Sequence, residues 1–191
     1  MDCALRALTF FACASGLFAQ TPAPNQSLFG LETPWEMAPI FHELAAHADR
    51  LMPLIEGANA EAWVRSGGAS DTYIAQRQSA MEQTRALATE AKALAAAPER
   101  LSLGLQVLIR LQAVDAMVGS LADAVRRYQT ARESQELLKV AAQSGSNRDR
   151  IQRYLVNLAA QREKEFEVMD REAQRCRGIV TQAPPKTTRK N

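Results

Sequence analysis

The sequence predicts an all-α protein, an antiparallel bundle of about four long helices, one of them kinked by proline, with one short extra helix. Two observations predict this fold. The chain is rich in Ala, Leu, Gln, Glu and Arg, and its aromatic residues make up only 6%, which favours helix over strand. Apolar residues also recur at steps of three and four along several stretches, the spacing that returns a helix to one face.

Residues 1–19 have the pattern of a secretory signal peptide. Arg6 precedes a short apolar run, and Ala19 supplies the small residue expected at the cleavage site. The run is too short to anchor the chain across a bilayer. We therefore expect cleavage after Ala19 and export to the periplasm or the extracellular space, with no transmembrane segment left. The alternatives are a lipoprotein cut before Cys13 and a buried N-terminal helix.

A linker at residues 20–33 leads into a helical bundle domain at residues 34–178, and a basic tail follows at residues 179–191. The linker and the tail both contain prolines and lack helical periodicity. We expect both to be disordered.

The first helix is expected at residues 34–56. Thr33 and Glu36 have the spacing of a capping box around Pro34, which suits the first helical position because its missing N–H would be unpaired there anyway. Pro39 marks an alternative start. The apolar stripe comprises Met37, Phe41, Leu44, Ala48, Leu51 and Ile55.

Prolines and glycines shape the connection that follows. Pro53 is expected to kink or end the first helix, because it lacks a backbone N–H and crowds the preceding turn. Asn59 is a candidate cap for a short helix at residues 60–65, which a Gly-Gly pair terminates. Trp63 lies in this helix and is expected to plug one end of the bundle.

The next helix is expected to begin at a cap formed by Ser70 or Asp71. Its stripe comprises Tyr73, Ile74, Arg77, Ala80, Met81, Thr84, Leu87, Ala88, Ala91 and Leu94. Only a few residues separate this stripe from Pro98, where the following helix is expected to start. So short a connection predicts an antiparallel hairpin of two helices.

The longest predicted helix covers residues 98–128, with Pro98 at its first position. Its stripe comprises Leu101, Leu105, Leu108, Leu111, Val114, Val118, Leu121, Val125 and Tyr128, broadened by Leu103, Ile109 and Met117. A helix this apolar must be covered on more than one side, so at least two other helices should lie along it. Leu108 and Leu121 are expected to lie in the core, and Leu103 to be less buried.

The stripe is interrupted at residues 129–134. Thr130 and Glu133 have the spacing of a second capping box, which predicts a break there and a short helix ending near Gln143. The alternative is one continuous helix through to Gln143, because no Gly or Pro interrupts it.

The last helix is expected to start at Ser146 or Asn147, after a Ser-Gly-Ser-Asn turn, and to end near Gly178. Its stripe comprises Ile151, Leu155, Leu158, Arg162, Phe166, Met169, Ala173 and Cys176.

The two histidines, His42 and His47, nearly match the zinc-protease motif H-E-x-x-H but stand five residues apart instead of four. On a regular helix this spacing places the imidazoles about 140° apart, so one metal ion cannot bind both. We expect solvated or hydrogen-bonded histidines, no metal site and no cofactor. The Glu-x-x-His pairs of di-iron bundles and the C-x-x-C-H motif of covalent haem are absent from the sequence.

Cys176 is the cysteine that remains after export, so no disulfide within the chain is expected. Its helical phase predicts a buried thiol that acts as a small apolar residue. The alternative is a disulfide between two chains, favoured by a thiolate between Arg175 and Arg177 if the residue is exposed.

Charged residues on the apolar stripes predict an ion pair between helices. Arg77 and Arg162 lie on such stripes, and Asp115 borders the apolar face of the longest helix. We expect each arginine either to extend toward water or to meet an acid such as Asp115, with a polar ligand site as the second interpretation. Trp35 and Trp63 are expected to be core residues rather than the lining of a cleft.

The sequence favours a non-catalytic role. No phosphate-binding loop, carboxylate pair or Ser-His-Asp arrangement is present, and a formal net charge of +2 gives no strong attraction for nucleic acid. We expect an exported bundle that mediates protein–protein or cell-envelope interaction. Because the first helix is shorter than the longest one, the apolar positions near Leu121 and Val125, or at the opposite end, are expected to need a partner or a second copy. The alternative is a carrier that holds a small apolar or amphipathic ligand between helices.

Overall fold

The computed structural model describes residues 32–181, and no strand occurs among them. The expected signal peptide and most of the linker and of the basic tail lie outside the described residues. The helices are α1 (Pro34–Glu56), α2 (Ala60–Gly67), α3 (Thr72–Ala96), α4 (Leu101–Tyr128), α5 (Ala131–Ala142) and α6 (Gly145–Thr181). The predicted all-α bundle is confirmed.

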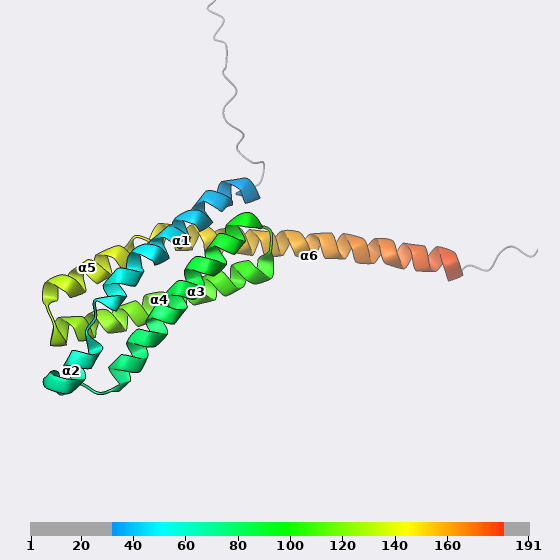
Figure 1. Cartoon of the computed structure of the whole chain (residues 1–191). Coiled ribbons are helices and arrows are strands. Elements are labelled where there is room, and N and C mark those ends of the chain that lie inside the picture. The colour runs from blue at the N-terminus through cyan, green and yellow to red at the C-terminus, as the bar shows by residue number, and fades with distance from the viewer. Residues whose placement is uncertain (1–31, 182–191) are drawn as a thin grey trace, which may run out of the picture. The chain divides into compact units, whose positions relative to one another are not determined.

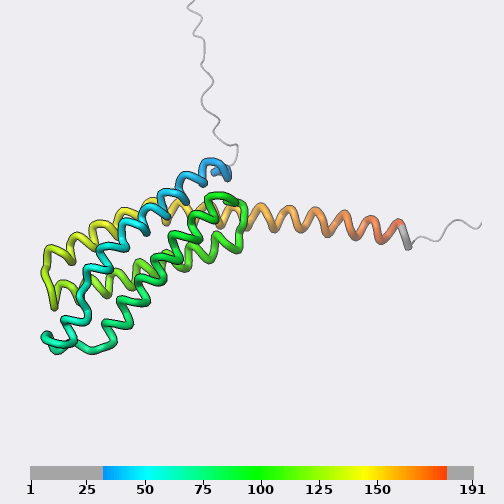
Figure 2. The backbone as a smooth tube through the Cα atoms, viewed as in Figure 1, coloured from blue at the N-terminus to red at the C-terminus, as the bar shows by residue number. Residues whose placement is uncertain are grey.

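The described helices pack as antiparallel rods (Figure 1). α1, α3 and α4 alternate in direction, and α5 with the first part of α6 forms the fourth rod. Figure 2 shows that the backbone passes from α5 into α6 across a short turn without reversing. α1 packs against α3, α5 and α6, and α4 packs against the same three helices. The longest predicted helix is therefore covered on several sides, as expected.

The predicted capping box starts α1 at Pro34, so the alternative start at Pro39 is wrong. The Thr33 N–H and hydroxyl both donate to Glu36 Oε2 at 2.7 Å. These hydrogen bonds favour the ionised carboxylate and lower the pKa of Glu36. At the other end, α1 continues past Pro53 to Glu56, so this proline does not end the helix.

Asn59 caps α2 as predicted, because its side chain accepts a hydrogen bond from the Ala62 N–H at 3.2 Å. α2 ends at Gly67, two residues later than expected, and Gly68 follows with a φ of 66°. This left-handed conformation favours glycine and closes the helix by donating to the Trp63 carbonyl.

Pro98 lies in the turn between α3 and α4, and α4 begins at Leu101. The prediction that Pro98 opens this helix is therefore wrong. A residue of α6 stabilises this turn, because the Tyr154 hydroxyl donates to the Pro98 carbonyl at 3.2 Å.

The buried face of α4 is offset from the predicted stripe at its start. Gly104 and Val107 are buried, whereas Leu105 is 46% exposed and Leu108 is only partly buried. The cause is a close crossing with α6. A Cβ atom at Gly104 would clash with Leu155 Cδ2, so the missing side chain makes room for Leu155. Apolar periodicity does not detect a glycine that is buried for its small size.

The break after α4 is confirmed. α4 ends at Tyr128 and α5 begins at Ala131, so one continuous helix through this region is wrong. The Thr130 hydroxyl accepts from the Glu133 N–H at 3.2 Å and donates to the Glu133 carboxylate at 2.6 Å. This reciprocal pair satisfies the exposed start of α5.

α4 is the helix among the described residues that is long and apolar enough to cross a membrane by length and composition. The core helix of a soluble protein passes the same test. The buried residues of α4 are Gly104, Val107, Leu111, Val114, Val118, Leu121, Ala122, Ala124 and Val125. Packing within the bundle accounts for this stripe. Leu121 and Val125 are therefore covered, and of the two ends expected to lack cover it is the opposite one that exposes apolar side chains, with Leu105 46% and Ile109 66% exposed.

Candidate functional site

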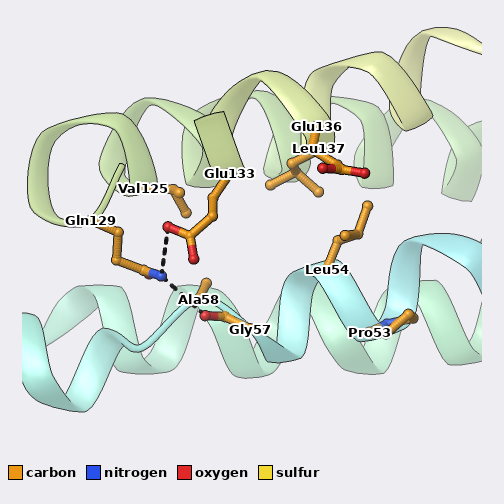
Figure 3. Close-up of a pocket in the computed structure, with 9 residues that line it drawn as sticks. All are labelled: Pro53, Leu54, Gly57, Ala58, Val125, Gln129, Glu133, Glu136 and Leu137. Atoms are coloured by element: carbon orange, nitrogen blue, oxygen red, sulfur yellow. Dashed lines mark hydrogen bonds between the residues drawn. The ribbon is translucent and has the colours of Figure 1, made fainter. Parts of the chain in front are cut away.

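A pocket of about 140 Å³ lies between the end of α1, the end of α4 and the start of α5 (Figure 3). Its lining residues are Pro53, Leu54, Gly57, Ala58, Val125, Gln129, Glu133, Glu136 and Leu137. The Gln129 amide donates to the Gly57 carbonyl at 3.2 Å, and its Oε1 accepts from the Asn59 N–H at 2.9 Å. Gln129 therefore joins the α1–α2 connection to the end of α4. Small-molecule pockets usually span roughly 300–1,000 Å³, so this volume suits a few waters.

The two histidines of α1 occupy different environments. His42 is exposed, which agrees with a solvated imidazole. His47 is 1% exposed, and neither of its ring nitrogens has a hydrogen-bond partner, so the expectation of a solvated or hydrogen-bonded group is wrong for it. Burial lowers the pKa of His47; Arg50 adds to the effect and Glu43 opposes it. Helical phase could have predicted this burial, because His47 stands three residues after Leu44 and four before Leu51, on the buried face of α1.

We predict that the free energy of unfolding falls as the pH is lowered from 7.5 to 5.5. The pKa of His47 is lower in the folded state, so the unfolded chain binds a proton near pH 6.5 while the folded chain does not. The loss should approach about 1.4 kcal/mol per pH unit until the pH reaches the folded-state pKa. Urea denaturation across this pH range measures it.

His47→Leu should reduce this pH dependence, because the titrating group is gone. His42→Leu is the matched control and should preserve it, since the imidazole of His42 is exposed. Equal pH slopes in the wild type and in His47→Leu would show that His47 is not the source.

Cys176 is exposed, so the prediction of a shielded thiol is wrong. Its helical phase is the expected one, since it continues the stripe of α6. The error lies in the assumption that the bundle covers this part of the helix. The other stripe residues beyond Leu158, namely Arg162, Phe166, Met169 and Ala173, are exposed as well.

Asp115 forms the predicted ion pair between helices, but with Arg148 of α6, at 2.8 Å. Burial raises the pKa of Asp115, and the Arg148 guanidinium opposes this shift. Arg77 instead meets Glu61 of α2 at 2.5 Å, and Arg162 meets Glu165 one turn along α6. Asp115 and Arg77 therefore form ion pairs between helices, whereas the ion pair of Arg162 lies within α6.

The two tryptophans differ. Trp63 is buried and stacks on Tyr128 with ring centroids 5.9 Å apart, while Tyr73 meets both rings edge-on. It plugs one end of the bundle as predicted. Trp35 is 73% exposed, so its assignment to the core is wrong.

The most unusual surface is the C-terminal part of α6, residues 160–179, which we call the α6 arm. Every side chain in the arm is exposed except that of Glu165, which is partly buried. Figure 1 shows α6 continuing past the end of the bundle where α3 turns into α4. Its large exposed apolar residues are Phe166, Val168, Met169 and Ile179. The buried residues of α6 are Ile151, Tyr154, Leu155 and Leu158, all before the arm.

The α6 arm exists because α6 is longer than the helices that pack against it. α6 has 37 residues, whereas α1 has 23 and α4 has 28. It also begins at Gly145, one residue earlier than predicted, and runs past Gly178 to Thr181, into the expected tail. At about 1.5 Å per residue, the 20 residues of the α6 arm are roughly 30 Å long. No neighbouring rod is long enough to cover them.

The described residues contain no group of three or more His, Cys, Asp or Glu side chains that could hold a metal ion. The two features that remain for a functional interpretation are the small pocket at the end of α1 and the α6 arm. No family model, curated protein or solved structure matches this chain.

Proposed function

We propose that this chain is an exported, non-catalytic protein that binds other proteins through the α6 arm. The observation that carries the proposal is the exposed apolar stripe of the arm, in which Phe166 is 68% and Met169 is 62% exposed. Exposed apolar patches on soluble proteins are often sites of protein association.

The stability of the arm supports the same interpretation. Most helical stability in proteins comes from packing an apolar face rather than from the helix alone. The arm has such a face, and its stripe continues the stripe that α6 buries against the bundle. A partner helix laid along this face would stabilise the arm and remove the stripe from water.

The hollows of the described residues favour association over the carrier alternative. The pocket at the end of α1, about 140 Å³, is below the usual range for a drug-sized or lipid-like ligand. The larger hollows, of about 390 and 450 Å³, are open surface grooves that would not enclose a ligand. Two polar residues of the pocket at the end of α1 are already engaged with each other, because the Gln129 amide donates to the Glu133 carboxylate at 3.4 Å.

The positions of the reactive residues support a non-catalytic role. Cys176 lies in the α6 arm, whereas both histidines lie on α1 and His47 is inside the core. A thiol nucleophile needs a base within hydrogen-bonding distance, and this arrangement does not supply one. Export rests on the signal pattern of residues 1–19.

Site-specific photocrosslinking in the organism that makes the protein tests association. A benzophenone amino acid at position 169 should give adducts with a protein, because Met169 lies on the apolar stripe. The matched control is position 171, because Arg171 lies on the opposite face of the same helix and should give few adducts.

Mass spectrometry of the adducts identifies the partner, and mass spectrometry of the protein itself should show a chain that begins at Gln20. Equal adduct formation at positions 169 and 171, or none at either, would contradict binding through the arm. An intact Met1 in the soluble fraction would contradict export.

A further inference from the structure

We infer that the partner of the α6 arm is the α6 arm of a second copy, paired with it in antiparallel orientation. This inference rests on the proposed function, because it names the partner of the same surface. Three features of the arm support it: the spacing of its stripe, the sizes of the stripe residues and the distribution of charge along it.

The stripe has the spacing of a two-stranded coiled coil. Phe166, Met169, Ala173 and Cys176 follow one another at steps of three, four and three, which is a repeat of 3.5 residues. This repeat keeps a narrow seam facing a single partner helix. The wider stripe of α4, by contrast, contacts three helices.

The sizes of these four side chains favour antiparallel pairing. Aligned so that Phe166 faces Cys176 of the second copy, the pair also places Met169 against Ala173. Each layer then joins one large and one small side chain, so the layers are of similar width. Parallel pairing would place Phe166 against the Phe166 of the second copy and Ala173 against its Ala173. Two layers of large side chains would then be followed by two layers of small ones, which packs poorly.

The charges favour the same orientation and alignment. Residues 162–170 carry two basic and four acidic side chains, a formal net charge of −2, and residues 171–177 carry three basic and one acidic, a formal net charge of +2. Antiparallel pairing lays each half of the arm along the opposite half of its copy. Parallel pairing would bring like halves together, which opposes association.

The N-terminal part of the α6 arm borders a groove on which the C-terminal part of the second arm can pack. A shallow groove at the start of α4 is lined by Leu101, Ala159, Arg162, Glu163, Phe166 and Glu167. The alignment through Phe166 and Cys176 places Arg175 and Arg177 of the second arm at one edge of this groove, beside Phe166 and Glu167. Glu163 and Glu167 complement that positive charge, Arg162 is engaged with Glu165 of its own helix, and Leu101 and Phe166 supply apolar surface.

Sedimentation equilibrium of the full chain at micromolar concentrations tests self-association. The wild type should form a dimer, and Met169→Asp should raise the dissociation constant by about 100-fold, because each dimer then buries two unpaired carboxylates. Val168→Asp is the matched control. Val168 is 53% exposed and lies off the stripe, so the same change should alter the constant by less than about 3-fold.

Disulfide trapping tests the orientation, in a full chain whose Cys3 and Cys13 are replaced by Ser. Under mild oxidation the chain with Cys176 alone should stay uncrosslinked, because the two thiols would lie about 15 Å apart along the pair. Phe166→Cys should give a covalent dimer linked between position 166 and Cys176, established by peptide mapping. Lys164→Cys, on the outer face, should not.

The outcomes separate this inference from the proposed function. A monomeric wild type whose position 169 crosslinks to a different protein would overturn self-pairing and leave the proposed function standing. A rapid Cys176–Cys176 disulfide would overturn the antiparallel orientation. A monomer that gives no adduct at position 169 would overturn both proposals.

Discussion

Replacing Phe41 with alanine should lower the free energy of unfolding by about 3–5 kcal/mol. Phe41 is 0% exposed and lies on α1, which packs against α3, α5 and α6. Its ring meets that of Tyr154 edge-on, with centroids 6.2 Å apart, so the substitution removes a contact between α1 and α6 and also opens a cavity. Chemical denaturation followed by circular dichroism measures the loss.

Phe166→Ala is the matched control, because it makes the same chemical change at an exposed position of α6. At concentrations where the chain is monomeric, it should change the free energy of unfolding by no more than about 0.5 kcal/mol. Equal losses at the two positions would mean that the arm packs within its own chain, against the exposure of its side chains.

Replacing Trp63 with alanine should cost about 3–5 kcal/mol as well. Trp63 fills the end of the bundle between Tyr73 and Tyr128, whose rings also contact each other. Removing the indole leaves a cavity lined by two rings that hold α3 and α4 in place. Thermal and denaturant unfolding should both show the loss.

Two further variants separate packing from polar effects at this site. Trp63→Phe keeps an aromatic ring, and it removes an indole N–H that is buried without a partner, so it should cost clearly less than Trp63→Ala. Trp35→Ala, at an exposed tryptophan, should be nearly neutral. A loss at Trp35 as large as that at Trp63 would contradict the assignment of Trp63 as the plug.

The sequence predicted the helices well because their signals are local. The capping pair of Thr33 and Glu36 and that of Thr130 and Glu133 satisfy helix starts through residues three apart, so no distant contact is needed to recognise them. The Asn59 cap and the left-handed Gly68 are local in the same way. Periodicity then located the buried faces of α1 and α3.

Sequence reasoning failed where exposure depends on a distant element. Leu105 continues the apolar period of α4 yet is exposed, because Leu155 of α6 packs against Gly104, one residue earlier in the helix. The exposure of Leu105 depends on which helix lies alongside, and a local pattern does not contain that information. His47 is different: its helical phase places it on the buried face of α1, but its residue type predicts a polar environment, and the structure buries it without a partner.

The same limit applies to the functional surface. The sequence by itself determined that α6 is an amphipathic helix with a stripe running from Ile151 to Cys176, because helical phase depends only on residue spacing. Only the tertiary structure decided that cover ends at Leu158 and that Phe166, Met169 and Cys176 meet water. Cover requires a neighbouring helix at the same height, and α6 continues past the end of the bundle, where the chain supplies none among the described residues.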